Sequence, residues 1–237
     1  MRVALITCWL FAAPLHAAHP LMTEDTGTLG DGRWQLELFS EAGEARGTGA
    51  RMDQDDAVLS YGLAPELDLQ AGVPWIRERA RGMGDITLDL KWRFLERGAF
   101  SLGLKPGVSL PTGNERKGLG AGRVGWGSLL IASYEPGPVA LHAHVGYKRN
   151  RNSIGERESL THISAAATVQ AAPGLKVVAD VASDSNPDPA QTRVERYLVF
   201  GVMWAVTRDF DLDIGFKKGF SSAALDEALL LGLAVRW

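Results

Sequence analysis

A strict alternation of apolar and polar residues runs along most of this chain and constrains its fold more than any other feature. From Phe210 to Lys217, one set of alternate positions holds Phe, Leu, Ile and Phe, and the other holds Asp, Asp, Gly and Lys. A helix would spread these residues around its surface, whereas a strand places them on opposite faces. The same pattern recurs from Ile86 to Phe94, from Val139 to Lys148 and from Leu231 to Trp237. The chain is therefore predicted to be all-β.

The alternating runs divide the chain into about twelve strands, most of about 9 to 13 residues, close to the length that a tilted membrane-crossing strand requires. The runs at 33–41, 51–61 and 158–171 are the least regular. The predicted strands are 33–41, 51–61, 66–76, 84–95, 99–110, 124–135, 139–148, 158–171, 175–184, 193–206, 210–220 and 226–237.

The connections between these runs alternate between short and long. Short connections rich in Pro, Gly, Asp and Glu occupy 62–65, 96–98, 136–138, 172–174 and 207–209. Longer polar connections occupy 42–50, 77–83, 111–123, 149–157, 185–192 and 221–225. Outer-membrane barrels show this asymmetry, with tight periplasmic turns and longer outward loops. We therefore expect 33–237 to form a single antiparallel transmembrane β-barrel with periplasmic N- and C-termini.

The number of strands indicates which face of the sheet points outward. Eight strands already enclose a space that side chains just fill, so twelve would leave an apolar interior hard to pack. A charged face turned to lipid would cost about 2–4 kcal/mol for each Lys or Arg at the membrane midplane. The polar face is therefore expected inside. The candidates to line the lumen are Asp68, Asp89, Lys91, Arg93, Lys105, His142, His144, Lys148, Asp180, Glu195, Asp211, Asp213, Lys217 and Arg236.

Aromatic residues gather near the ends of the predicted strands, which is typical of the girdles at the two interfaces between lipid and water. Tyr197 and Trp204 have opposite parity on one strand, so one of them should point inward unless a bulge intervenes. The terminal Trp237 resembles the C-terminal aromatic signal that the barrel-assembly machinery recognises. The expected girdle residues are Trp34, Tyr61, Trp75, Trp92, Trp126, Tyr134, Tyr147, Trp204, Phe210 and Trp237.

The first residues are typical of a secretory signal. Arg2 precedes an apolar run of about 13 residues, too short to span a membrane as a helix, and small residues follow at 17–18. We expect 1–18 to be a cleaved signal peptide and the protein to lie in the outer membrane. Cys8, the one cysteine, falls inside it. Residues 19–32 either hang in the periplasm or fold into the lumen as a plug.

Short motifs spread over the chain resemble a known family. They include 19–30 (HPLMTEDTGTLG), Tyr61-Gly62-Leu63, 82–85 (GMGD) before Lys91-Trp92-Arg93, and Leu110-Pro111-Thr112-Gly113. Together they resemble the bacterial outer-membrane family named for the meta-pathway of phenol degradation, whose members are described as transporters. The resemblance implies a barrel that takes up hydrophobic or aromatic compounds.

Several clusters were weighed as chemical sites. His142 and His144 share a face and would bind a metal only with further ligands such as His162 or Asp180, so we expect them to be polar lumen residues. His162 and Ser164 lack an acid fixed beside them by spacing. Asp211, Asp213, Lys217, Glu195 and Arg236 are expected to pair across adjacent strands. The glycines at 118, 120 and 122 precede no helix and indicate a mobile external loop rather than a phosphate site.

These observations favour a transport protein without catalytic residues, cofactor or metal. The expected function is passive passage of small molecules through a narrow lumen whose charges set selectivity. The alternatives are a closed structural or interaction barrel and, less favoured, an outer-membrane hydrolase. A soluble periplasmic barrel is the rival fold. The expected partners are membrane lipid, a small solute and the assembly machinery; the net charge of −3 gives no reason to expect nucleic acid.

Overall fold

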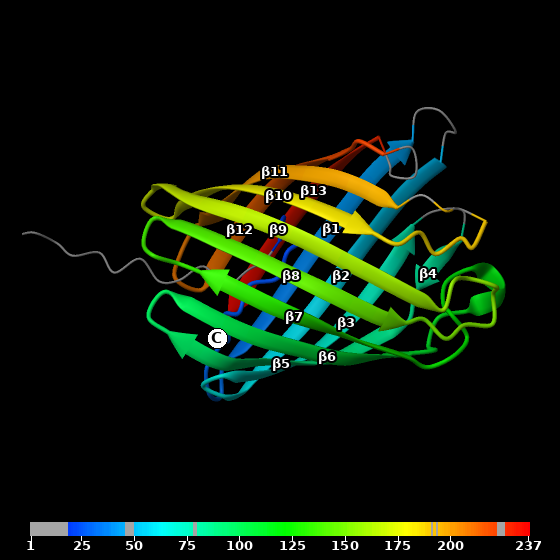
Figure 1. Ribbon diagram of the computed structural model, residues 1–237, viewed down its shortest axis with the longest axis horizontal. Coiled ribbons are helices and arrows are strands. Elements are labelled where there is room, and N and C mark those ends of the chain that lie inside the picture. The colour runs from blue at the N-terminus through cyan, green and yellow to red at the C-terminus, as the bar shows by residue number, and fades with distance from the viewer. Residues whose placement is uncertain (1–18, 46–49, 78–79, 191, 193, 222–225) are drawn as a thin grey trace, which may run out of the picture.

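The computed structural model describes residues 19–45, 50–77, 80–190, 192, 194–221 and 226–237. The expected signal peptide, with Cys8, lies outside these residues. The described chain forms one sheet that closes on itself (Figure 1), because β2 pairs with β3 as well as β1, and β1 pairs with β13. Its strands are β1 (Trp34–Ala45), β2 (Ala50–Ala64), β3 (Leu67–Arg77), β4 (Arg81–Met83), β5 (Ile86–Arg97), β6 (Phe100–Leu110), β7 (Gly125–Tyr134), β8 (Val139–Arg149), β9 (Ser159–Ala172), β10 (Leu175–Asp184), β11 (Glu195–Ala205), β12 (Phe210–Gly219) and β13 (Glu227–Arg236).

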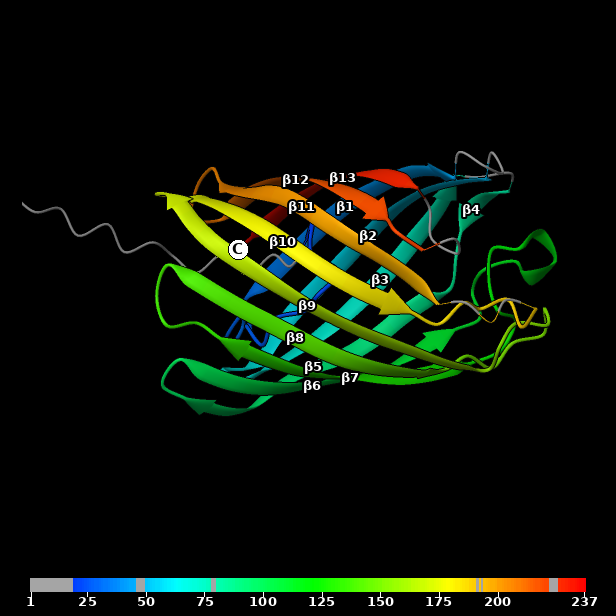
Figure 2. The same cartoon turned by 45° about the horizontal axis from the view of Figure 1, so that its top comes forward.

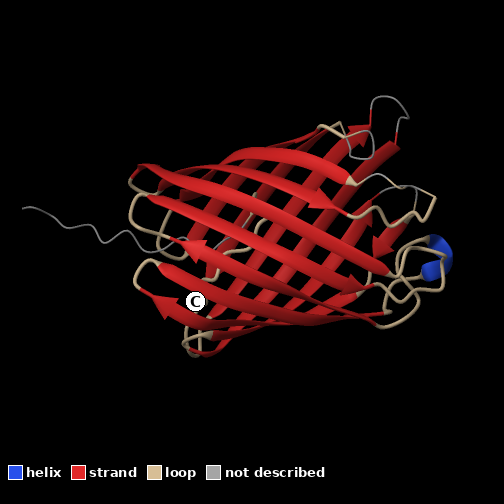
Figure 3. Ribbon diagram, viewed as in Figure 1, coloured by secondary structure: helices blue, strands red, loops and turns tan. Residues whose placement is uncertain are grey.

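The predicted barrel of twelve antiparallel strands is confirmed. The short β4 and β5 both pair with β3 and are separated only by Gly84 and Asp85, so they form two parts of one barrel strand. Strand structure dominates the described residues (Figure 3), which also include a 3-10 turn, η1 (Glu115–Lys117). Within these residues, no helix is long and apolar enough to cross a membrane.

The described residues of two expected long loops lie mainly in strands. The β1–β2 pairing continues to Ala45 and Ala50, within the expected loop 42–50. The β3–β4 pairing joins Arg77 to Arg81, within the expected loop 77–83. The hydrogen-bond ladder continues beyond the apolar belt of the wall, where outward residues no longer need to be apolar. Hydrophobic alternation therefore ends before the strands do.

The apolar face points outward, as predicted. Leu212, Ile214 and Phe216 are 37%, 48% and 46% exposed on the outer surface, whereas Asp211, on the inner face of the same strand, is 2% exposed. A soluble barrel would show the reverse. Water-free lipid around such a wall removes the cost of exposing these side chains, and the closed ladder leaves no unpaired sheet edge.

The two ends of the barrel differ (Figure 2): short turns join strands at one end and longer loops at the other. The seam lies at the turn end, where Trp34 N donates to Trp237 O at 3.0 Å and Trp237 N to Trp34 O at 3.1 Å. At the loop end, residues 111–124 are tied down rather than extended freely. The Asp85 carboxylate accepts from Gly113 N at 2.9 Å and Ala121 N at 2.7 Å, and Leu119 is buried.

Candidate functional site: the lumen and the segment inside it

Residues 19–31, here called the lumen segment, run inside the barrel. Backbone amides along the segment donate to side chains of the surrounding wall. Met22 N and Thr23 N both donate to Asp180 Oδ2 at 2.7 Å, and Thr23 Oγ1 donates to Asp180 Oδ1 at 2.9 Å. The other backbone contacts are Glu24 N to His144 Nδ1 at 2.9 Å, Thr26 N to Ser133 Oγ at 3.1 Å and Leu29 N to Asp68 Oδ2 at 3.0 Å. The wall therefore satisfies amides of a chain without regular secondary structure.

A charge cluster fixes the middle of the lumen segment. Glu24 contacts Lys105 and, at 3.1 Å, Lys91, which also lies 3.1 Å from Asp25. The Lys91 side chain is 6% exposed. Removing one partner from a buried cluster leaves the other charge without a counter-charge. The free-energy cost of that uncompensated charge exceeds the net stabilisation that the ion pair provides.

The beginning of the lumen segment packs on an apolar part of the inner wall. Leu21 contacts a cluster of Val178, Met203 and Ala234. Met22 packs on a second cluster, formed by Ala182, Tyr197, Val199 and Leu230. Polar anchoring in the middle and apolar packing at the start thus hold the same short stretch.

Glycines in the wall allow the segment to approach closely. A Cβ at Gly62 would lie 1.8 Å from the carbonyl oxygen of Gly30, and one at Gly215 would lie 2.6 Å from Pro20 Cβ. Neither contact is sterically possible, so any larger residue at these positions displaces the segment or the wall. The wall is therefore shaped to the segment at two places, on β2 and on β12, with β1 and β13 between them.

The structure places the expected lumen residues in three settings. Asp68, Lys91, Lys105, His144, Asp180 and Asp213 contact the lumen segment. Others bond to the wall itself: His142 to Ser133 at 2.9 Å, Arg236 to Asp211 at 2.5 Å, Arg93 to Glu96 at 3.0 Å and Glu195 to Asn186 at 3.3 Å. Asp89 and Lys148 line open chambers at the loop end.

The expected ion-pair ladder is only partly formed. Asp211 and Arg236 pair across β12 and β13, as expected. Lys217 instead pairs with Glu41 of β1 at 2.8 Å, and Asp213 contacts His19 of the lumen segment. His19 precedes the first strand, and Glu41 is on β1, which is separated from β12 by β13, so pairing across adjacent strands did not predict these two contacts.

His144 and His162 both contact other residues of the lumen. The His144 and His162 rings lie 4.5 Å apart, and His162 contacts Asp184. The Ser164 and Thr23 hydroxyl oxygens lie 2.8 Å apart, within hydrogen-bond distance. Ser164 therefore bonds to Thr23, whereas His162 contacts Asp184.

The expected girdle residues lie on the outer surface at the two ends of the barrel wall. Trp34 stacks near Tyr61 and Trp237 at the turn end, with ring centroids 4.6 and 6.4 Å away. At the loop end, Trp126 and Tyr147 lie 5.8 Å apart. Of the two β11 aromatics with opposite parity, Tyr197 points inward at 5% exposure and Trp204 outward at 51%. Exposed large rings also include Trp75, Trp92 and Tyr134, while Phe210 is half-buried.

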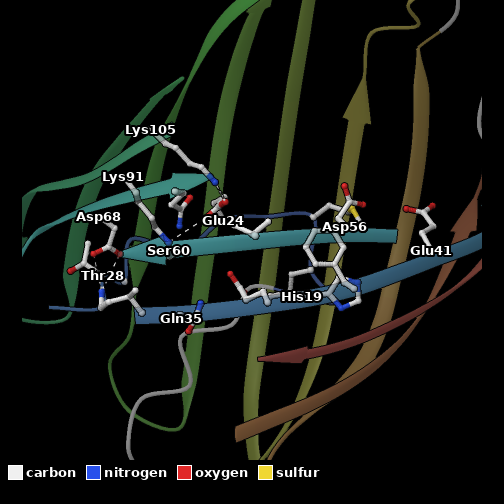
Figure 4. Close-up of a pocket in the computed structure, with 18 of the residues that line it drawn as sticks. His19, Glu24, Thr28, Gln35, Glu41, Asp56, Ser60, Asp68, Lys91 and Lys105 are labelled. Carbon is white, nitrogen blue, oxygen red and sulfur yellow. Dashed lines mark hydrogen bonds and ion pairs between the residues drawn. The ribbon is translucent and has the colours of Figure 1, made fainter. Parts of the chain in front are cut away.

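The lumen segment leaves open space beside it. A cavity of about 380 Å³, here called the β1–β3 cavity, lies between the segment and the wall (Figure 4). Towards the loops, two chambers of about 620 and 670 Å³ adjoin it. The side chain of Lys105 lines all three spaces, and Phe39 lines both the cavity and the smaller chamber. The lumen is therefore narrowed rather than filled.

Residues 23–237 match the family described as "Putative MetA-pathway of phenol degradation". The chain belongs to this family. A COG4313 outer-membrane channel from Pseudomonas putida F1 has a similar fold, with a TM-score of 0.67 at 16% identity, covering 90% of this chain and 98% of that one. The KdgM porin has a TM-score of 0.63 at 7% identity, and the NanC porin 0.58 at 7%; each match covers 85% of this chain and 98% of the porin. No curated protein matches the chain.

Proposed function

We propose that this protein is an outer-membrane channel through which small molecules pass passively. The observation that carries the proposal is the set of adjoining cavities beside the lumen segment. They share lining residues, and charged side chains line each of them. A lumen built only for stability would be filled by side chains, as in small barrels.

The apolar outer surface and the aromatic rings at both ends support a position within a lipid bilayer. In the proposed orientation, the turn end, where the chain ends at Trp237, faces the periplasm, and the longer loops face outward. The alternating strand that ends at Trp237 fits recognition by the barrel-assembly machinery. Detergent-dependent extraction and heat-modifiable migration of the barrel test the membrane location.

The solutes proposed are small molecules that combine polar groups with a hydrophobic or aromatic body. The inner wall offers both kinds of surface. Charged groups such as Asp89 and Lys148 line the chambers, and Leu129 and Tyr197 line the larger of them. Charged linings of this kind set selectivity in pores.

The lumen segment itself favours a second candidate, a closed structural barrel. Its many contacts with the wall would suit a permanent plug. Conductance of the purified barrel in planar bilayers, together with solute flux into liposomes, separates the two functions. The channel proposal expects stable current steps and flux; absence of both, from barrels shown to be folded by heat-modifiable migration, would favour the closed barrel.

A further inference from the structure

The β1–β3 cavity carries an excess of carboxylates. Its lining includes Glu24, Glu37, Glu41, Asp56 and Asp68, against the two lysines Lys91 and Lys105. On β1, Glu37, Phe39 and Glu41 alternate on the inner face, and Asp56 of β2 lies opposite Phe39 in the strand register. Figure 4 shows Glu41 and Asp56 on the wall facing the same space as His19. Negative charge is therefore concentrated around one aromatic ring.

Three of these carboxylates form no ion pair within the described residues, and one of them, Asp68, accepts from Leu29 N instead. Glu41 pairs with Lys217 at 2.8 Å, and Glu24 pairs with both cavity lysines. Asp56 accepts from the neutral Gln54 amide, at 2.8 and 3.0 Å. Within the described residues, neither Asp56 nor Glu37 takes part in an ion pair. A mobile cation entering the cavity would therefore find carboxyl groups that are not already paired with a lysine or an arginine.

Buried acceptors without partners face the same cavity, independently of the carboxylates. Ser60 and Gln70, which are adjacent across β2 and β3, are 1% and 8% exposed. Among the described groups, Ser60 Oγ and Gln70 Oε1 have no hydrogen-bond partner. Buried polar atoms are normally paired with protein groups or with water, so these two oxygens are available to accept hydrogen bonds from whatever occupies the cavity. An ammonium group is a hydrogen-bond donor, whereas an anion is not.

The Phe39 ring adds an aromatic surface to the charged lining of the cavity. It lines both the β1–β3 cavity and the adjoining chamber, so it lies where they meet. The His19 ring stacks against it with centroids 5.0 Å apart. An aromatic ring close to carboxylates suits a cation that carries apolar groups, because the ring attracts positive charge and also contacts apolar surface.

We propose that the β1–β3 cavity is a binding site for a small organic cation, a protonated amine with an apolar body, and that it makes the channel selective for such solutes. This inference rests on the proposed channel function and names its substrate class. The carboxylates Glu37 and Asp56 attract the ammonium group, Ser60 and Gln70 accept its hydrogen bonds, and Phe39 contacts the apolar body.

Current measurements in planar bilayers test the site. Phenethylammonium and the similarly sized anion 3-phenylpropionate are added to the chamber while potassium current is recorded through the barrel. We expect phenethylammonium alone to reduce the current, and a potassium chloride gradient to show preference for potassium. The double variant Glu37→Gln, Asp56→Asn should weaken the block by about tenfold or more. Glu135→Gln, in an exposed turn, is the matched control and should leave the block unchanged.

Calorimetric titration of phenethylammonium into the folded barrel separates the two proposals. Current without preference between the two probes, or a block unaffected by the double variant, overturns the cation site and leaves the channel intact. Binding without any current overturns the channel and retains the site. Neither current nor binding overturns both. Phe39→Leu, which keeps every charge, should weaken binding of phenethylammonium more than binding of methylammonium.

Discussion

The position of the lumen segment inside the barrel, here called its seated state, should depend strongly on the carboxylate of Asp180. Asp180, which is 3% exposed, accepts hydrogen bonds from Met22 N, Thr23 N and Thr23 Oγ1. At about 1 kcal/mol net per bond, Asp180→Ala should destabilise the seated state by about 3 kcal/mol. Since 1.4 kcal/mol corresponds to a factor of ten, the unseated fraction should rise by about a hundredfold.

Cysteine labelling measures this fraction directly. Thr28 is 7% exposed inside the barrel, so in a Cys8→Ser background a Thr28→Cys reporter reacts with a membrane-impermeant maleimide only when the segment leaves its seat. The labelling rate then follows the unseated population. We expect Asp180→Ala to accelerate labelling by about a hundredfold.

Asp188→Ala, in the exposed loop after the same strand, is the matched control and should leave the rate unchanged. Asp180→Asn keeps the shape of the side chain and should give an intermediate rate. A labelling rate for Asp180→Ala equal to that of the control would refute the assignment of Asp180 as the anchor of the segment.

Three further outcomes follow from the geometry. Ile214→Lys places a charge near the middle of the outward face at a cost of about 2–4 kcal/mol and should lower the yield of heat-modifiable barrel, whereas Ile154→Lys, in a loop, should not. Gly215→Leu collides with Pro20, since a Cβ there lies 2.6 Å from it, and should accelerate labelling of the Thr28→Cys reporter. Asp85→Ala removes the acceptor for Gly113 N and Ala121 N and should speed tryptic cleavage within 111–124 of the folded barrel.

Most of the barrel strands could be predicted from the sequence, because the alternation that marks each strand depends only on residues close together in the chain. A strand with lipid on one side and polar groups on the other must alternate, so each crossing is visible in its own ten or so residues. The predicted and observed limits of 175–184 coincide with β10. The prediction weakened where strands extend beyond the apolar belt, as at Arg77 and Arg81, because nothing there requires outward residues to be apolar.

The candidate site was only partly predictable, because its contacts join residues that are far apart in the chain. The inward orientation of Asp180, Asp213 and Lys217 follows from strand parity alone. Their partners do not: His19 lies 194 residues from Asp213, and Glu41 lies 176 from Lys217. The alternation shows on which face of the sheet each residue lies, but not which segment of the chain occupies the lumen. The periplasmic and plug alternatives for residues 19–32 therefore remained open.

One feature of the sequence did indicate that a segment of the chain lies inside the lumen. Strands covered by apolar groups on both faces show continuous hydrophobic runs instead of alternation. Such runs occur at Tyr197–Trp204 and Ala228–Leu231, and they hold the inward Val199, Met203 and Leu230. In a lumen containing only water, inward apolar residues would gain nothing from their position. Here they pack against Leu21 and Met22 of the lumen segment. Loss of alternation on β11 and β13, the strands on either side of β12, therefore indicates which part of the inner wall is covered by another segment of the chain.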